Sequence, residues 1–285
     1  MVQPSNIFAT TAHNMGLTKL LLPLLLVIGS SAFGNQLSSK AVIQDSSQTT
    51  SQTSSQNSRQ PESPINLYRA NYSAKFSGLN IQAVQKLEEI EPGVYRESLS
   101  AKNFIGKINE QSTFSLTPDQ QLSPTQYSYK RSVFGRDRSE VQSFDWQNSV
   151  VQYIKEGSAN SQLDLETGYL DMITHRLQLR RDLNAGKQVF SYPVISRGKL
   201  KQYDYRVVSK QILETTIGPL NTVKVERVTD DDKKKVNVWL ACDWDYLIVK
   251  LEQSKGKDSH YLELLDAVIN DKQLTPLAKT DEKQL

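Results

Sequence analysis

Apolar and polar side chains alternate along the chain between Ile65 and Asn270, which is the period of a β-strand. Tyr68, Tyr72 and Phe76 recur every four residues and therefore share one face of a predicted strand. The same alternation predicts strands over 94–101, 107–116, 125–134, 140–146, 150–155, 202–209, 222–228, 236–240, 247–253 and 260–269. Turn residues separate these runs about every 8–12 residues, as in a meandering barrel or sandwich. The pattern predicts a mainly β domain over 65–270, an antiparallel open β-barrel or half-barrel.

One segment, 169–183, carries its apolar residues at helical spacing instead. Thr167 is expected to cap the start of this helix, and Gly186 can end it. A single amphipathic helix among some ten strands should cover the open mouth or concave face of the sheet. If that face holds a ligand, the helix residues expected to contact it are Tyr169, Leu170, Ile173 and Leu177.

The N-terminal segment 1–34 has the pattern of a secretory signal peptide. Lys19 precedes an uncharged run from Leu20 to Ile28, and small residues follow it up to Gly34. Nine residues at 1.5 Å each reach about 14 Å, well short of the ~30 Å hydrocarbon core of a membrane. We therefore expect export to the periplasm by the Sec machinery, cleavage after Gly34 and no stable membrane span afterwards. Translation begins at either Met1 or Met15, and the two starts give the same mature protein.

The predicted domain is flanked by polar segments. Residues 35–64 are rich in Ser, Gln and Thr and offer almost nothing to bury, so we expect a disordered leader. Residues 271–285 are expected to form a flexible C-terminal tail.

Composition narrows the possible functions. Thirty-four Lys and Arg against 31 Asp and Glu leave a net charge of +3, which indicates neither nucleic acid nor an acidic membrane surface as a partner. One cysteine excludes a disulfide within the chain, and three histidines leave little for a metal centre. No cofactor and no metal site are expected.

Candidate catalytic chemistry is sparse. His175 lies four residues after Asp171, a spacing that could orient a general base on a helix, but no motif ties a nucleophile to it. Cys242 is the only thiol, and no neighbouring cation would lower its pKa. Asp230 to Asp232 lack the spacing of a calcium loop and are followed by three lysines, which favours a solvated hairpin tip. We expect no catalytic residues and no enzyme.

The 23 aromatic residues lie mostly on predicted strands. Such residues are usually core, but a wide sheet that does not close could instead use them to line a cavity for an apolar ligand. Arg131, Arg136 and Arg138 at the rim could then meet an anionic headgroup.

The order of several short motifs resembles a bacterial family, domain of unknown function 3108. They begin with Tyr72-Ser-Ala-Lys-Phe76-Ser-Gly78 and Leu122-Ser-Pro124-Thr-Gln-Tyr127, and continue with Phe144-Asp145-Trp146, Leu170-Asp171-Met-Ile and Leu177-Gln-Leu-Arg180. Ile217-Gly218-Pro-Leu-Asn-Thr-Val-Lys-Val-Glu226, Val238-Trp239-Leu-Ala241 and Tyr246-Leu-Ile-Val249 complete the series. The resemblance covers about Leu67 to Ala267. It implies an envelope protein of Gram-negative bacteria with no assigned catalytic residues, and an open barrel around a helix as in lipoprotein-localisation carriers.

Three functions remain open from the sequence. The first is a periplasmic binding or carrier module that shelters an apolar or lipid-like ligand under the helix. The second is a cell-envelope assembly or structural factor that acts through protein–protein contacts. The third, an enzyme that uses His175 or Cys242, is disfavoured by the missing motifs.

Overall fold

The structure is a computed structural model and describes residues 64–76, 79–229, 231, 234–256 and 258–278. The expected signal peptide and nearly all of the expected leader lie outside these residues. Within them, the chain forms fifteen strands and one helix, in mostly the order that the alternation predicts. The strands of the first half are β1 (Tyr68–Phe76), β2 (Leu79–Glu91), β3 (Val94–Asn103), β4 (Gly106–Leu116), β5 (Leu122–Val133), β6 (Arg136–Asp145), β7 (Val150–Lys155) and β8 (Ser161–Asp164). After α1 (Thr174–Asn184) come β9 (Val189–Ile195), β10 (Leu200–Thr215), β11 (Gly218–Val228), β12 (Lys234–Ala241), β13 (Leu247–Lys255), β14 (Asp258–Ile269) and β15 (Lys272–Gln273).

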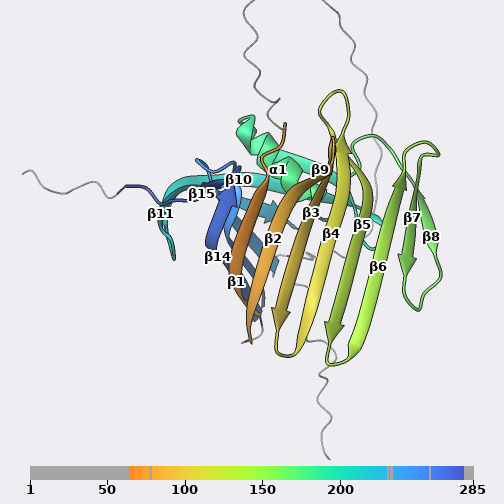
Figure 1. The fold of residues 1–285 in the computed structure, drawn as a ribbon, viewed down its shortest axis with the longest axis horizontal. Coiled ribbons are helices and arrows are strands. Elements are labelled where there is room, and N and C mark those ends of the chain that lie inside the picture. The colour runs from red at the N-terminus through yellow and green to blue at the C-terminus, as the bar shows by residue number, and fades with distance from the viewer. Residues whose placement is uncertain (1–63, 77–78, 230, 232–233, 257, 279–285) are drawn as a thin grey trace, which may run out of the picture.

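The strands form one antiparallel sheet. Fourteen of them follow the order β8-β7-β6-β5-β4-β3-β2-β1-β14-β13-β12-β11-β10-β9, and β15 pairs with β14 off this path. The first and last long strands, β1 and β14, meet in the middle of this order, with Tyr68 opposite Ile269. No ladder joins β8 to β9 among the described residues, so the curved sheet is an open half-barrel (Figure 1). This confirms the predicted fold class.

Side-chain packing bridges the open seam near one end. Gly198, in the turn between β9 and β10, lies against Tyr153 of β7, and a Cβ atom at Gly198 would be 2.5 Å from the tyrosine ring. Nearer the other end, Leu170 forms an isolated bridge with Val194 of β9. The two sheet edges are therefore held together by contacts of the connecting segments, without a continuous hydrogen-bonded ladder.

Helix α1 begins five residues later than the predicted start at Tyr169. Thr167 does not cap it; instead, the Asp171 carboxylate accepts hydrogen bonds from the backbone N–H groups of Ile173 (2.7 Å) and Thr174 (2.8 Å). The Thr174 hydroxyl in return accepts from the Asp171 backbone N–H at 2.9 Å. Gly186 ends the helix as predicted, with a φ of +82° and the paired hydrogen bonds of a Schellman motif.

The core lies between α1 and the concave face of the sheet. Alternate strand residues supply it, among them Tyr72, Tyr95, Phe114 and Leu264, each at most 2% exposed. The helix lies across the upper end of the half-barrel in Figure 1.

The ordered domain extends beyond the predicted boundary at 270. β15 pairs with β14, and Leu274 is 2% exposed within the core. Leu277 donates its backbone N–H to the Pro219 carbonyl at 2.8 Å. The segment expected to be a flexible tail therefore begins, within the described residues, as part of the sheet packing.

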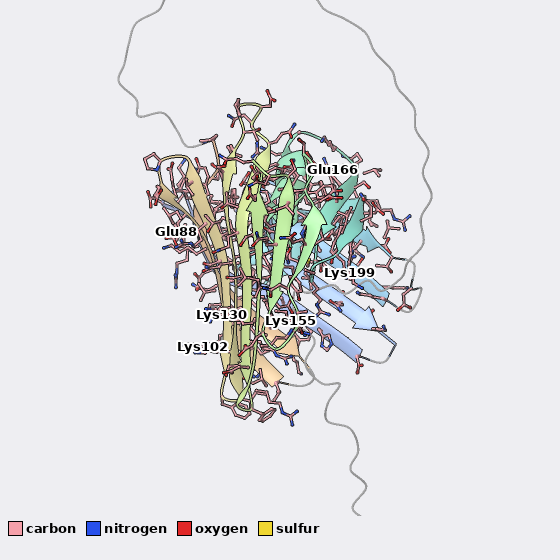
Figure 2. All side chains as sticks on the ribbon, turned by 90° about the vertical axis from the view of Figure 1, so that its right-hand side faces the viewer. Glu88, Lys102, Lys130, Lys155, Glu166 and Lys199 are labelled. Atoms are coloured by element: carbon pink, nitrogen blue, oxygen red, sulfur yellow. The ribbon has the colours of Figure 1, made fainter. Side chains whose placement is uncertain are left out.

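Acids are more numerous at the hairpin connections of one end of the half-barrel than at those of the other, where Asp137, Glu156, Asp231 and Asp258 accompany the cations. Consecutive hairpin connections of a meander alternate between the ends, so one end holds the β2–β3, β4–β5, β6–β7, β10–β11 and β12–β13 connections. Acids gather there: Glu88, Glu89, Glu91, Asp119, Asp145, Asp243 and Asp245. The opposite end carries Lys102, Lys107, Arg136, Lys155, Lys199 and Lys255. In Figure 2 the labelled glutamates lie toward the top and the labelled lysines lower down.

Candidate functional site

The helix residues that were expected to contact a ligand lie in or against the hydrophobic core. Leu170, Ile173 and Leu177 are 4%, 1% and 2% exposed. Tyr169 is half-buried and packs against the same core cluster. Only Leu177 lies within α1, whereas Tyr169, Leu170 and Ile173 precede it. The ligand contact proposed for the four residues stays a prediction.

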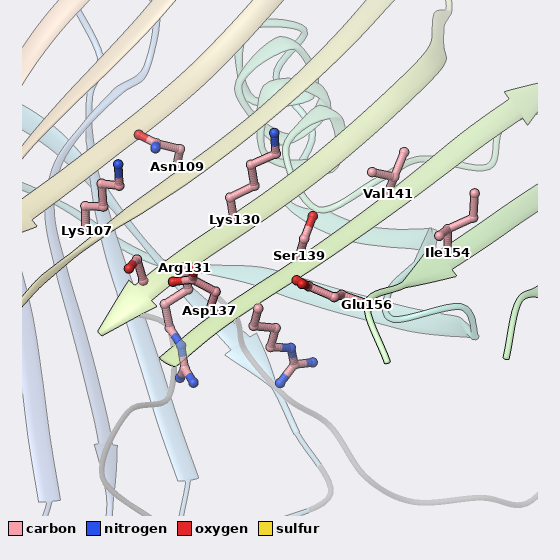
Figure 3. A pocket seen from close by; sticks show the side chains of 11 residues that line it. Lys107, Asn109, Lys130, Arg131, Asp137, Ser139, Val141, Ile154 and Glu156 are labelled. Carbon is pink, nitrogen blue, oxygen red and sulfur yellow. The ribbon is translucent and has the colours of Figure 1, made fainter. Parts of the chain in front are cut away.

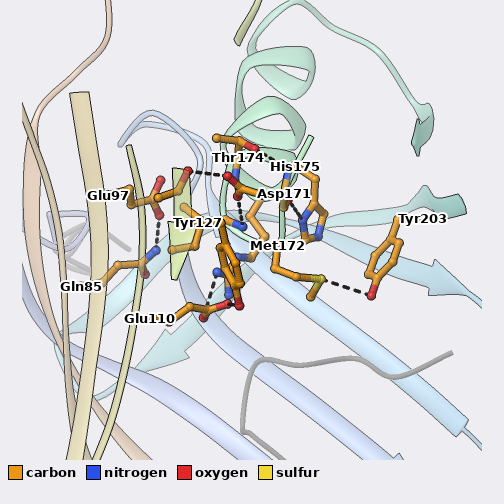
Figure 4. Close-up of polar contacts among 12 residues, drawn as sticks. Gln85, Glu97, Glu110, Tyr127, Asp171, Met172, Thr174, His175 and Tyr203 are labelled. Atoms are coloured by element: carbon orange, nitrogen blue, oxygen red, sulfur yellow. Dashed lines mark hydrogen bonds and ion pairs between the residues drawn. The ribbon is translucent and has the colours of Figure 1, made fainter. Parts of the chain in front are cut away.

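Beneath α1, buried charged side chains join the helix to the sheet (Figure 4). Glu110 of β4, 2% exposed, forms an ion pair with Arg176 of α1 at 3.3 Å. The same carboxylate accepts a hydrogen bond from the Tyr127 hydroxyl at 2.8 Å. Burial and the Glu110 charge raise the pKa of Tyr127 well above its usual value, so the phenol stays protonated and acts as a donor.

A second carboxylate repeats this arrangement one strand away. Glu97 of β3 accepts from the Tyr68 hydroxyl at 2.8 Å and from the Gln85 amide at 2.5 Å. Arg180 of α1 stacks over the Tyr68 ring with 4.7 Å between the guanidinium carbon and the ring centroid, and pairs with Asp245 at 2.8 Å. The interior under the helix therefore contains a network of buried ion pairs and hydrogen bonds that holds α1 in place together with the apolar core.

Asp171 is fully buried and caps the helix from within this network. It accepts a short hydrogen bond from the Ser112 hydroxyl of β4, in addition to the two backbone N–H groups of the cap. Burial raises its pKa to about 6, and these hydrogen bonds oppose the rise. The carboxyl group consequently titrates close to neutral pH.

His175 does not form the carboxylate pair that its spacing suggested. Its Nδ1 lies 3.0 Å from the Asp171 backbone oxygen, and its Nε2 lies 3.1 Å from the Tyr205 hydroxyl. Burial first, and the Arg176 charge second, lower the pKa of His175 well below its usual value. Both ring nitrogens are engaged within the core, an arrangement that locks α1 onto β10.

Cys242 and the acidic run also occupy structural positions. The Cys242 thiol is half-buried, and burial followed by the Asp243 charge raises its pKa, which disfavours the thiolate. Asp231 lies in the connection between β11 and β12, as the predicted hairpin tip requires, and pairs with Lys255 at 3.4 Å. Asp230 and Asp232 lie outside the described residues.

At the end of the half-barrel opposite α1, cations occupy the concave face. Lys201 is in phase with Tyr203 and Tyr205 on β10, and Arg227 is in phase with the buried valines of β11. Lys234 begins β12 on the same face as Val236. Arg227 and Lys234 are only 6% and 7% exposed. Lys201 and Lys234 lie just outside the predicted strands 202–209 and 236–240, so the cluster was not predicted. The expectation that Lys234 belongs to a solvated hairpin tip was wrong, because Lys234 begins β12 with its side chain buried.

These cations lie close enough to destabilise one another's charged forms. Burial, then the charges of Arg197 and Arg227, lower the pKa of Lys201. Burial, then Arg227 and Lys255, lower the pKa of Lys234 to about 8, against an opposing effect of Asp231. The Arg227 guanidinium lies 3.9 Å from the centroid of the Tyr203 ring. This cation cluster, defined as Lys201, Arg227 and Lys234, would be stabilised by a bound anion.

A separate open cavity of about 590 Å³ lies on the outer face of β4–β7 (Figure 3). Lys107, Asn109, Lys130, Ser139 and Ile154 contribute to its lining. Arg131 and Arg138, expected at the rim, also border it, whereas Arg136 is exposed at the adjoining hairpin. The cavity is thus on the far side of the sheet from the helix residues predicted to contact a ligand.

The described residues contain no helix with the length and apolar character to cross a membrane. Within the same residues, no cluster of three or more His, Cys, Asp or Glu side chains is arranged to hold a metal ion.

Comparison with known proteins gives one family match. The family described as "Protein of unknown function (DUF3108)" matches residues 71–262. No curated protein matches this sequence.

Solved structures with a similar fold share little sequence with this chain. A β-barrel-like protein of domain of unknown function DUF1849 from Brucella abortus is 12% identical, with 72% of this chain and 98% of that chain covered and a TM-score of 0.48. A porin-like protein from Bacteroides uniformis is 7% identical, with coverage of 72% and 97% and a TM-score of 0.27. A candidate exported protein with a YmcC-like fold from Bacteroides fragilis is 10% identical, with coverage of 74% and 95% and a TM-score of 0.23.

Proposed function

We propose a function for this chain from the premise that it belongs to the DUF3108 family, whose description assigns none. The protein is a non-catalytic binding module that the Sec machinery exports to the periplasm. Its ligand is lipid-like and carries an anionic headgroup. The export pattern of residues 1–34 supports the compartment.

The cation cluster is the observation that carries this proposal. Arg227 and Lys234 keep cationic side chains largely out of water, and the Arg227 charge destabilises the charged forms of both Lys201 and Lys234. A phosphate or carboxylate placed among them would relieve that repulsion and accept charge-assisted hydrogen bonds. The aromatic ring of Tyr203, against which Arg227 stacks, adds apolar surface beside the headgroup.

The position of the cluster modifies the expectation from the sequence. Ile173, just before α1, and Leu177 within it pack into the protein's own core, so the ligand would enter from the end farthest from α1. The headgroup would bind at Lys201, Arg227 and Lys234, and the ligand's apolar part would lie toward the concave face. The buried residues with perturbed pKa values beneath α1 hold the helix and supply no reactive group.

Native mass spectrometry of the protein purified after export, followed by organic extraction, tests the proposal. We expect an additional mass that extracts as a lipid, or uptake of added phosphatidylglycerol by the unliganded protein. The double variant Lys201→Gln and Lys234→Gln should lose this mass because the headgroup loses two cationic partners. Lys210→Gln, which removes an exposed lysine from the same strand as Lys201, is the matched control and should retain it.

Two outcomes would overturn the proposal. One is a protein with no extra mass and no uptake of added lipid. The other is a lipid that remains bound to the double variant as it does to the wild type. Either result would favour the second function considered from the sequence, an envelope assembly factor that acts through protein contacts.

A further inference from the structure

Two exposed phenylalanines stand on neighbouring hairpin tips at the end of the half-barrel opposite α1. Phe104, between β3 and β4, is 87% exposed, and Phe134, between β5 and β6, is 66% exposed. The Phe134 backbone N–H donates to the Ile105 carbonyl at 3.1 Å, which joins the two tips. The two tips are therefore adjacent, and each presents an exposed phenylalanine to solvent.

Phe134 occupies a backbone position that favours other residues. Phe134 and Gly135 are the central residues of the turn that pairs Val133 with Arg136, and their φ angles are +50° and +70°. A two-residue hairpin with two positive φ angles is most often Asn-Gly, and a bulky side chain at the first position is strained. Phe134 therefore adds both backbone strain and exposed apolar surface. Neither benefits the isolated folded chain.

The tip that carries Phe104 is held in a fixed conformation. The Asn103 side-chain oxygen accepts hydrogen bonds from the backbone N–H groups of Ile105 (3.0 Å) and Gly106 (3.1 Å). Gly106 permits a close approach to β5, because a Cβ atom there would lie 2.3 Å from the Ser132 carbonyl oxygen. Phe104 is thus displayed on a supported turn, which limits the entropy lost when its ring becomes buried against a partner.

Positive charge surrounds the two rings. Residues 100–108 and 130–138 contain the cations Lys102, Lys107, Lys130, Arg131, Arg136 and Arg138 and the acid Asp137. Of these cations, Arg138 is paired with the buried Glu140. The outer-face cavity between Lys107 and Lys130 opens beside the tips. The net charge of the whole chain does not indicate an acidic membrane surface as a partner. In the fold, however, most of the acids near the hairpin connections lie at the other end, so they do not neutralise the cations beside Phe104 and Phe134.

We propose that this end of the protein docks on an anionic lipid bilayer. The Phe104 and Phe134 rings would enter the boundary between headgroups and acyl chains, and the surrounding lysines and arginines would contact the anionic headgroups. Exposed aromatic side chains that project from hairpin tips and have cations beside them can insert into an anionic bilayer. A protein partner would instead need a groove shaped to receive both rings. The inference is independent of the proposed interior ligand, because the tips could dock whether or not a lipid occupies the concave face.

Co-sedimentation of the exported protein with vesicles tests the docking surface. We expect the wild type to bind mixed phosphatidylglycerol–phosphatidylcholine vesicles and to bind pure phosphatidylcholine vesicles at least about tenfold more weakly. Raising the salt concentration from about 0.1 to about 0.5 M should release it, since screening weakens exposed charge contacts. The double variant Phe104→Ser and Phe134→Asn should lose at least about tenfold in vesicle affinity.

The same variant separates docking from folding. Phe134→Asn installs the preferred turn residue, so the double variant should keep the wild-type melting temperature or exceed it by a few degrees while vesicle binding falls. Ile212→Ser removes an apolar side chain that is 62% exposed on β10 and serves as the control, with unchanged vesicle binding.

Three results would overturn the inference: a wild type that ignores phosphatidylglycerol vesicles, a double variant that binds like the wild type, or a loss of binding in Ile212→Ser equal to that in the double variant. A double variant that loses a chemically cross-linked protein complex, while the wild type binds no vesicles, would assign the tips to a protein partner instead. Lipid extraction from the interior is a separate measurement, so failure of one proposal does not decide the other.

Discussion

Replacing Asp171 with asparagine should change how the free energy of unfolding depends on pH. Burial raises the pKa of Asp171 from its ordinary 3.8 to about 6 in the folded protein. Between these values the folded state binds a proton that the unfolded chain has released, so this group's contribution to stability falls as pH rises. A difference of about 2 pKa units corresponds to about 3 kcal/mol, lost progressively between about pH 4 and pH 6.

His175 acts in the opposite direction and has to be separated from this effect. Its pKa is lowered well below 6.5 in the folded protein, so below pH 6.5 the unfolded chain binds more protons. The stability contribution of His175 therefore rises as pH increases toward 6.5, and the two groups partly cancel in the wild type. Subtracting the free energy of unfolding of Asp171→Asn from that of the wild type leaves mainly the Asp171 contribution, since both proteins retain His175.

Urea unfolding followed by tryptophan fluorescence at several pH values from 4 to 7 provides the measurement. The wild-type free energy of unfolding minus that of the variant should fall by about 3 kcal/mol across this range. The amide oxygen of the variant can still accept from the Ile173 and Thr174 N–H groups, so the helix cap survives. Asp119→Asn, which removes an exposed acid, controls for loss of a carboxylate in general. A difference that stays constant with pH would refute the view that burial raises the pKa of Asp171 to about 6 in the folded protein.

Three further predictions concern the packing of the half-barrel. Gly106→Ala should lower the free energy of unfolding by about 1–3 kcal/mol in chemical denaturation, because the new Cβ would collide with the Ser132 carbonyl. An unchanged midpoint of the denaturation curve would show that β4 and β5 can move apart freely. Glu110→Ala should lower the free energy of unfolding by about 3–5 kcal/mol, because it leaves Arg176 buried without its acid. Glu88→Ala, which breaks an exposed ion pair, should lower it by at most about 1 kcal/mol, and equal losses in the two variants would contradict this reasoning. Leu274→Ala should cost about 2–5 kcal/mol in the same assay, and a neutral result would mean that the segment after β15 does not belong to the core.

Local pattern predicted most strands because alternation is a property of neighbouring residues. It failed for β2, where Ile81, Val84 and Leu87 are spaced by three as in a helix, and where pairing with β1 and β3 on both sides decides the conformation. It also missed the two edge strands, β8 and β9, of which β9 contains Pro193.

The start of α1 could have been placed more accurately from sequence. Asp171 and Thr174 stand three residues apart, the spacing of a reciprocal helix cap, and that signal is more specific than the lone Thr167. The preceding residues, by contrast, are apolar at helical spacing although Leu170 forms a bridge with β9, so periodicity alone extends the helix too far.

The charged interior could not be predicted from sequence. Glu97 and Glu110 lie on strands where a polar residue normally faces solvent, and their partners Tyr68 and Arg176 are 29 and 66 residues away. The cation cluster has the same origin, since Lys201, Arg227 and Lys234 come together only when β10, β11 and β12 pair. Long-range pairing determines both groups, and no local motif encodes it.

The pairing of β1 with β14 has a consequence for how the chain folds. Tyr68 and Ile269 are opposite each other in the ladder, although about two hundred residues of chain separate them. When the chain emerges N-terminus first, β1 can pair with β2 at once, but its other edge has no partner until β14 has emerged. Such a non-local contact slows folding, and an open strand edge invites pairing with other chains. Until the last long strand arrives, the emerging chain must keep the open edge of β1 from pairing with other chains. We expect folding to end with a single late step in which the C-terminal strands close the centre of the sheet.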